Sequence, residues 1–168
     1  MHRAFAALAV VPLVALGFLA IGPVAAAADQ GLPEPVIDSD ESELFALNLY
    51  HEARSEGRDG MIAVGWVVLN RAADPEYPDS VEGVITEGAD SRCKWGWLCD
   101  GKSDQPKEAD MWALARDVTE LMASPDRPAD PTRGALWFHR TVREKPSWMA
   151  DQVQRTATLG SHHFYGRN

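Results

Sequence analysis

The chain has 168 residues, of which 45% are hydrophobic and 24% are charged, and this length and composition predict one globular domain. Its formal net charge is −9 at pH 7, which argues against nucleic acid as a partner because phosphate binding needs a basic face. The negative charge is also typical of soluble exported proteins, so by itself it points to no substrate.

Residues 1–28 have the features of a secretory signal peptide. Arg3 supplies an early positive charge, an apolar run follows it, and residues 25–28 offer the small-residue spacing read by signal peptidase. An uncleaved anchor is the alternative, because about 20 apolar residues can span a bilayer, but prolines and glycines interrupt this run. We expect cleavage before Asp29, a mature net charge of −10 through the loss of Arg3, and an exported protein that is periplasmic or secreted.

Residues 29–39 contain two prolines and no periodicity, and they predict a linker. A working domain over residues 40–168 follows it. At its start, apolar residues recur at helical spacing and predict a helix over residues 41–54, with Glu52 in the last turn.

Gly57 and Gly60 are expected to bracket a short loop after this helix. Residues 61–71 are apolar nearly all round and too short to span a membrane. A helix of this kind is typical of the buried centre of a domain, although the valines would also suit a strand. Ser80 is expected to cap a short helix over residues 81–85.

Residues 87–104 are rich in Gly, Asp and Ser and predict loop or short β structure. A helix is predicted to begin near Pro106, since proline suits a first helical turn, and to end before Pro125. The aromatic run 135–139 predicts a short strand. Together these elements predict an α+β protein, mainly helical and single-domain, with a few short strands.

Cys93 and Cys99 enclose five residues. In an oxidising compartment a disulfide is the default, and a loop of this size can be closed by one. Metal binding is the weaker alternative, because two thiols without a second pair are half a zinc site. No cofactor is expected.

The pair His51-Glu52 begins like a zinc-protease motif, but the position that needs the second histidine is Ser55. The remaining histidines, among them His139 and His162, lack ligand spacing, so no metal site is predicted. The sequence also lacks the Gly-x-Ser-x-Gly elbow of serine hydrolases.

Glu52 therefore remains as the candidate for acid-base chemistry. Cleavage of a glycosidic bond needs a carboxyl that stays protonated, and apolar surroundings favour the protonated form. From the local sequence alone, the more common outcome is a solvated glutamate at a helix end, paired with Arg54 or Arg58.

Six tryptophans are many for one small domain. Trp95 and Trp97 lie in a Gly-containing loop and are expected to present exposed faces that stack on sugar rings, with packing over the core as the alternative. The other tryptophans are assigned to the core (Trp66 and Trp112) or left unassigned (Trp137 and Trp148).

Several sequence blocks together resemble the SleB-like cell wall hydrolases, a family named for a spore cortex-lytic enzyme. The resemblance covers roughly residues 44–165, which is nearly the whole expected domain. Its blocks are 46–57, 60–64 with 68–71, 93–101, 134–139, 146–148 and 160–165.

This resemblance implies a lysozyme-like domain that cuts peptidoglycan between N-acetylmuramic acid and N-acetylglucosamine. The family's catalytic glutamate lies in a Glu-Ala-Arg-x-Glu-Gly motif, which matches Glu52. Members of this type are lytic transglycosylases, in which one glutamate acts as acid and then as base and a 1,6-anhydro sugar is formed. Ordinary hydrolysis needs a second carboxylate, for which Glu56 and Asp100 are the candidates.

The residues expected to contact the glycan are Tyr50, Trp95, Trp97, His139, His162 and Tyr165. The segment 94–97 departs from the aromatic loop common in the family. No peptidoglycan-binding repeat is recognisable, so the catalytic groove alone is expected to find the wall.

Two other functions stay open on the sequence. One is a metal-dependent peptidoglycan amidase or peptidase that uses His51, His139 and His162. The other is a non-catalytic wall-binding module that uses Trp95 and Trp97. In each case the expected partner is peptidoglycan, the expected state is a monomer, and membrane contact is expected only if the leader stays uncleaved.

Overall fold

The computed structural model describes residues 36–90, 92–143, 147 and 152–168. The predicted leader, most of the predicted linker and Trp148 lie outside these residues. In the described ranges, no helix combines the length and the apolar character needed to cross a membrane.

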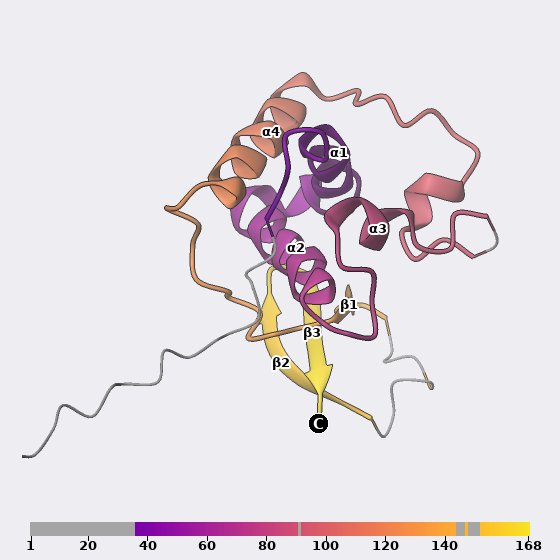
Figure 1. Ribbon diagram of the computed structural model, residues 1–168, viewed down its shortest axis with the longest axis vertical. Coiled ribbons are helices and arrows are strands. Elements are labelled where there is room, and N and C mark those ends of the chain that lie inside the picture. The colour runs from indigo at the N-terminus through magenta and orange to yellow at the C-terminus, as the bar shows by residue number, and fades with distance from the viewer. Residues whose placement is uncertain (1–35, 91, 144–146, 148–151) are drawn as a thin grey trace, which may run out of the picture. The chain divides into compact units, whose positions relative to one another are not determined.

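Four α-helices form the larger part of the domain: α1 (Ser42–Ala53), α2 (Gly57–Ala72), α3 (Val81–Thr86) and α4 (Ala109–Ala123). Helix α2 lies at the centre, with the other three helices around it and the sheet on its remaining side (Figure 1). Its side chains Met61, Val64, Val67 and Leu69 have no exposed surface. The prediction of a buried helix over 61–71 is therefore confirmed, as is the cap of α3, where Ser80 Oγ accepts a hydrogen bond from Gly83 N (3.0 Å).

The loop predicted between Gly57 and Gly60 is wrong, because these residues form the first turn of α2. A 3₁₀ turn, η1 (Arg54–Glu56), joins α1 to α2 directly. Gly57 has φ 67°, a conformation that glycine adopts without strain and that redirects the chain within one residue. A side chain at position 60 would overlap that of Glu56. The two glycines thus allow a tight helix–helix junction immediately after Glu52.

Helix α4 begins three residues later than Pro106 and ends before Pro125 as predicted. A contact distant in sequence lies immediately before this start. The hydroxyl of Tyr50 accepts hydrogen bonds from the backbone N–H groups of Lys107 (2.9 Å) and Glu108 (3.1 Å). These groups are therefore held against α1, and the helix starts after them.

The three strands are β1 (Trp137–Arg140), β2 (Val153–Leu159) and β3 (His162–Arg167). They form an antiparallel sheet in the order β1-β3-β2, so the last strand in the chain is the central one. In the register, Trp137 lies opposite Tyr165 and His139 lies opposite His163. The predicted α+β class is confirmed. Within residues 87–104, the described part contains a short 3₁₀ helix, η2 (Gly96–Cys99), and no strand.

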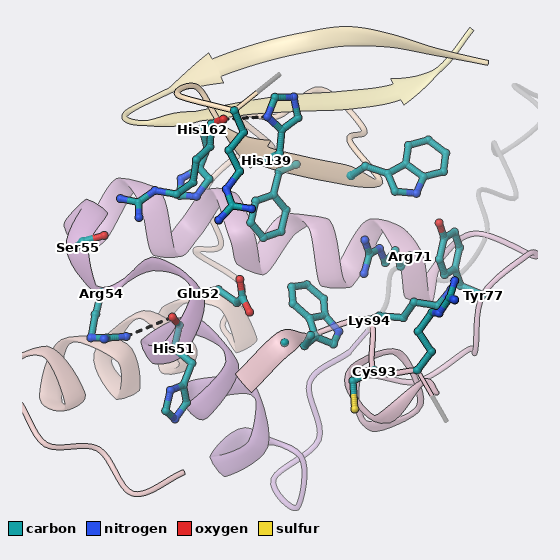
Figure 2. Close-up of a pocket in the computed structure, with 17 residues that line it drawn as sticks. His51, Glu52, Arg54, Ser55, Arg71, Tyr77, Cys93, Lys94, His139 and His162 are labelled. Atoms are coloured by element: carbon teal, nitrogen blue, oxygen red, sulfur yellow. Dashed lines mark hydrogen bonds between the residues drawn. The ribbon is translucent and has the colours of Figure 1, made fainter. Parts of the chain in front are cut away.

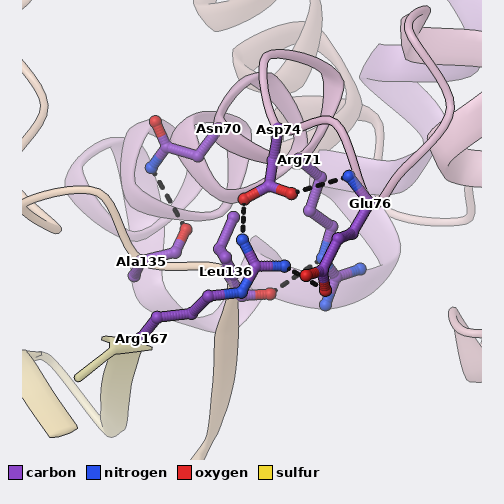
Figure 3. Close-up of polar contacts among 7 residues, drawn as sticks. All are labelled: Asn70, Arg71, Asp74, Glu76, Ala135, Leu136 and Arg167. Atoms are coloured by element: carbon purple, nitrogen blue, oxygen red, sulfur yellow. Dashed lines mark hydrogen bonds and ion pairs between the residues drawn. The ribbon is translucent and has the colours of Figure 1, made fainter. Parts of the chain in front are cut away.

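The C-terminal end of α2 is fastened to the sheet by side-chain contacts (Figure 3). Asn70 Nδ2 donates to Ala135 O (3.1 Å), and Arg71 Nε donates to Leu136 O (2.8 Å), both in the segment that enters β1. At the end of β3, Arg167 pairs with two carboxylates that follow α2, those of Asp74 and Glu76. These contacts fix the distance between α2 and the strands, and with it the space between them.

Candidate active site

Glu52 lines a cavity of about 1090 Å³. The walls of this cavity come from the end of α1, the end of α2, the disulfide loop around residues 92–96, and strands β1 and β3. Figure 2 shows Glu52 and Arg71 on the helical side of the cavity and His139 and His162 on the strand side. The fold thus brings together residues more than 100 positions apart in the chain.

The carboxylate of Glu52 is half-buried, and it makes no hydrogen bond or ion pair with any residue that the structure describes. Burial raises the pKa of Glu52, and the nearby charge of Arg71 lowers it, the effect of burial being larger. Arg54 pairs with Glu108 instead (3.2 Å). The expectation of a solvated glutamate paired with Arg54 is therefore wrong, and the carboxyl is available to a ligand.

Arg71 is almost fully buried, with 8% of its surface exposed. Its guanidinium lies over the ring of Trp95 (4.9 Å) and over the ring of Tyr77 (5.4 Å), in cation–π contact with both. Its Nε donates to Leu136 O, whereas its Nη1 is buried and has no hydrogen-bond partner. A positive charge is thus held rigidly in the cavity wall with part of its hydrogen-bonding capacity unused.

Positive charge dominates the cavity. Six of the 16 Lys and Arg residues of the chain line it, and Glu52 supplies the single carboxylate among the described lining residues. The chain as a whole has a net charge of −9, so this concentration is local. The six basic residues are Arg54, Arg71, Arg92, Lys94, Arg140 and Arg143.

The two candidates for a second carboxylate do not line this cavity. Glu56 accepts hydrogen bonds from Ser161 N (2.8 Å) and Ser161 Oγ (2.5 Å), and these bonds lower the pKa of Glu56. Asp100 pairs with Lys102 (2.8 Å), whose hydrogen bonds lower the pKa of Asp100. It lines a neighbouring cavity of about 330 Å³, which Glu52 also borders. Both carboxylates are thus already engaged, Glu56 in holding the β2–β3 hairpin.

The expectation that Trp95 and Trp97 present exposed stacking faces is wrong. Trp95 is 2% exposed and Trp97 is 8% exposed. Their indole N–H groups donate to Val84 O and Asn48 Oδ1, both at 3.0 Å. The two rings pack into the core, while Trp66 and Trp112 are partly buried against it as predicted. The hydrogen-bond acceptors of Trp95 and Trp97 lie on α3 and α1, respectively. The sequence pattern around Gly96 does not reveal these contacts.

His51, His139 and His162 line the cavity that contains Glu52, and most of the histidines are engaged in other contacts. His51 stacks on Trp97 (4.7 Å between ring centroids), and its Nε2 contacts Asp104 O (3.0 Å). His139 uses both ring nitrogens, on Arg140 O (2.9 Å) and on the hydroxyl of Tyr165 (3.0 Å). Over the described ranges, no three His, Cys, Asp or Glu side chains gather as a metal site would require.

Of the predicted glycan-contacting residues, the structure brings His139, His162 and Trp95 to the cavity that contains Glu52. Tyr50 and Tyr165 are buried and do not line it. Their hydroxyls instead hold the segment before α4 and the ring of His139. Tyr50 and Trp97 line the neighbouring cavity that Glu52 also borders, and the glycan contacts of these residues stay predictions.

A disulfide joins Cys93 to Cys99, with 6.1 Å between the Cα atoms, as predicted. It closes the loop that contains η2 and that carries Lys94 and Trp95. The loop supplies one wall of the cavity.

Sequence reasoning missed Arg71 and Tyr77 as parts of the site. A signal for Arg71 was present in the sequence. It stands at the end of an otherwise apolar helix, and arginine is rarely buried unless it is paired. Tyr77 lies in a proline-containing loop and carried no comparable signal.

Comparison with known proteins gives consistent matches. The family described as Cell Wall Hydrolase matches residues 55–165, a range that begins just after Glu52. The spore cortex-lytic enzyme of Bacillus subtilis is 43% identical over 129 residues, which are 75% of this chain and 37% of that protein. The enzyme of the same name from Halalkalibacterium halodurans is 45% identical over 124 residues, 73% of this chain and 33% of that protein. The match thus spans little more than a third of these relatives.

Two solved structures share the fold. The catalytic domain of the Bacillus cereus SleB protein aligns with a TM-score of 0.59 at 23% identity, covering 83% of this chain and 99% of that one. The catalytic domain of the germination-specific lytic transglycosylase SleB from Bacillus anthracis aligns with a TM-score of 0.58 at 23% identity, covering 77% and 96%. The fold described above is therefore that of these catalytic domains.

Proposed function

The chain belongs to the cell wall hydrolase family, and from that premise we propose that it cleaves the glycan strands of peptidoglycan with Glu52 as general acid and base. The observation that carries the proposal is the state of Glu52. Its carboxyl is half-buried, its pKa is raised by burial, and it is unpaired among the described residues in a cavity that can admit a polymer. A carboxyl in these surroundings is suited to donate a proton near neutral pH.

The proposed reaction needs no co-reactant. Glu52 donates its proton to the glycosidic oxygen as the bond from the anomeric carbon of muramic acid to that oxygen breaks. The resulting carboxylate then accepts the proton of the 6-hydroxyl of the same muramic acid residue, whose oxygen bonds to the anomeric carbon. The products are a 1,6-anhydro muramic end and a free 4-hydroxyl, and Glu52 is again protonated.

The carboxylates around Glu52 favour this route over hydrolysis. A retaining or an inverting glycosidase positions a second carboxylate on the other side of the scissile bond. Among the described residues that line the cavity, Glu52 is the single carboxylate. Glu56 and Asp100 are engaged by Ser161 and Lys102. An attack by the substrate's own hydroxyl requires no such partner.

The first test is the substitution Glu52→Gln, which keeps the size of the side chain and removes its proton. We expect loss of lysis of purified sacculi by about a hundredfold or more, because general acid-base catalysis contributes about 10² to 10⁴ in rate. The matched control is Glu43→Gln, which changes an exposed glutamate on the same helix. Lysis at the parent rate by the Glu52→Gln variant would overturn the proposal.

The products of the parent protein distinguish the reaction type. Mass spectrometry of digested peptidoglycan should show 1,6-anhydro muramic ends. Reducing muramic ends would indicate hydrolysis, and released stem peptides would indicate an amidase. The last result would contradict glycan cleavage altogether.

The proposed substrate lies outside the cytoplasm, so the proposal includes export. Residues 1–28 are proposed as the leader, on the sequence features described above. The N-terminal sequence of the protein recovered from its producing cells tests this. A start at Asp29 is expected, and a retained Met1 would indicate an anchor.

A further inference from the structure

Arg71 has the properties of an anion-binding residue. It is 8% exposed, its guanidinium lies against two aromatic rings, and its Nη1 donor is buried without a partner. A buried charged donor left unpaired is destabilising unless a ligand completes it. Figure 2 shows Arg71 and Tyr77 together at one end of the cavity that holds Glu52.

The carboxylates near Arg71 leave its Nη1 donor without a hydrogen-bond partner in the described structure. Glu87 and Glu52 act on the pKa of Arg71 through their charges, but neither forms an ion pair with it in the described structure. Glu87 pairs with Lys94 through Oε1 (3.5 Å), whereas its Oε2 is buried and has no hydrogen-bond partner in the described structure. Arginine stays protonated in proteins, so the charge of Arg71 remains available to a ligand.

Further cations surround the entrance. Arg92 and Lys94 lie on the disulfide loop, and Arg140 and Arg143 lie at the end of β1 and just after it, and all four are exposed. The described structure shows no ion pair for Arg92, Arg140 or Arg143. Positive charge thus extends from Arg71 to both walls of the cavity.

We infer that this cavity contains a carboxylate-binding subsite, centred on Arg71, that takes the stem peptide carried by muramic acid. The inference rests on the proposed function and names the part of the substrate that the site recognises. The sugar rings themselves are neutral, whereas stem peptides carry several free carboxylates. Cations on two walls suit several carboxylates spread over a peptide better than the single lactyl carboxylate of a stripped strand.

Binding can be measured without cleavage in the full chain carrying Glu52→Gln. The probes are soluble glycan fragments in three forms: with intact stem peptides, with peptide carboxylates amidated, and with peptides removed by an amidase to leave lactyl carboxylates. We expect calorimetry to give the tightest binding for intact peptides and about tenfold weaker binding for the amidated form, the loss typical of one charge-assisted contact. Equal affinity for these two forms would overturn the subsite. Equal affinity for the intact and stripped forms would overturn the assignment to the peptide.

Variants locate the subsite. Arg71→Met keeps an unbranched apolar stem and should abolish the preference for intact over amidated peptides. Because that variant can also disturb the core, the double substitution of the exposed Arg92 and Lys94 by Gln serves as the second variant and should reduce the preference at least threefold. Arg116→Gln, an exposed arginine on α4 that does not line the cavity, is the matched control and should leave the preference unchanged. An unchanged preference in the double variant would contradict the inference.

The two proposals fail separately. If parent protein with intact Glu52 releases no fragments but still prefers intact peptides, glycan cleavage fails and the subsite stands. If it cleaves sacculi but the preference is absent, the subsite fails and the cleavage stands.

Discussion

Glu52 and Arg71 together set the electrostatics of the cavity. Burial favours the neutral carboxylic acid at position 52, and the charge of Arg71 opposes this without forming an ion pair. Because the folded protein holds the proton of Glu52 more tightly than an unfolded chain does, this residue also affects stability. The burial that raises the pKa of Glu52 also makes its ionised form unfavourable in the folded protein.

The folded-state pKa of Glu52 is raised, so its favourable contribution is complete below the unfolded pKa of about 4.3 and is lost as pH rises through the folded value. Glu52→Gln removes the titration, and we therefore expect a higher Tm than the parent at pH 7. The difference should shrink at pH 4 and below. Thermal unfolding of parent and variant at the two pH values measures it.

The exposed Glu43→Gln serves again as the control and should not alter the Tm difference between pH values. A Glu52→Gln variant with a lower Tm than the parent at pH 7 would contradict the placement of this carboxyl in a desolvated site.

At the scale of single residues, the sequence singled out Glu52, the proposed acid, but not its surroundings. Glu52 was found by a motif and by the failure of the zinc pattern at Ser55. Arg54 pairs with Glu108, which lies 54 positions away in the sequence, and no local pattern predicts such a pair. The same holds for Trp97, whose indole N–H donates to Asn48 on α1, 49 positions earlier in the chain.

At the scale of elements, Glu56 links the junction between α1 and α2 to the sheet. Glu56, in the 3₁₀ turn after Glu52, accepts two hydrogen bonds from Ser161 in the β2–β3 hairpin. Gly160 leaves space for the carboxylate, because a side chain there would overlap it, and its φ of 52° suits glycine. The turn that follows the proposed acid is thereby tied to the strand that carries His162.

We expect Glu56→Gln to destabilise the protein at pH 7 by about 1 kcal/mol, since a charged acceptor is replaced by a neutral one at a partly exposed site. The lowered pKa of Glu56 means that its contribution is present above the unfolded pKa and is lost as pH falls through the folded value. Urea unfolding at pH 7 and at low pH should show the two proteins converging in acid. Glu120→Gln on the exposed face of α4 is the control, and equal stability of the Glu56→Gln variant and the parent at pH 7 would contradict a structural role.

Helices were the most predictable elements because their periodicity is local. The four predicted helices are present, and the errors lie at their ends. Gly57 was interpreted as a loop residue, whereas its left-handed conformation allows two helices to meet almost directly. The segment just before α4 is held by the hydroxyl of Tyr50, which is more than 50 residues earlier in the chain. Ends are set by long-range contacts, and these cannot be inferred from spacing.

At the scale of the whole molecule, charge is divided unevenly. The chain carries a net charge of −9, yet six cations and one carboxylate line the cavity in the described structure. Net charge alone predicts repulsion from an acidic wall polymer. The local field predicts attraction at the place where the substrate would bind. Composition could not predict this, because it does not say where the charges lie.

Attraction at the cavity and repulsion by the net charge predict opposite effects of salt on the rate of lysis. If the cavity dominates, the initial rate of sacculus lysis should fall between about 0.01 and 0.3 M salt, because the Debye length shortens from about 30 Å to under 10 Å and screens the attraction. If the net charge dominates, the rate should rise. Turbidity loss at constant pH measures the rate, and a Tm measured at each salt concentration excludes unfolding as the cause.

The order of the strands also determines when the site can exist. Strands β1 and β2 pair only with β3, so neither has its partner until residues 162–167 have been made. A chain synthesised from its N-terminus therefore carries Glu52 for more than 100 residues before the opposite wall, with His139 and His162, can take its place. The proposed site is thus expected to be complete only when the final strand closes the sheet.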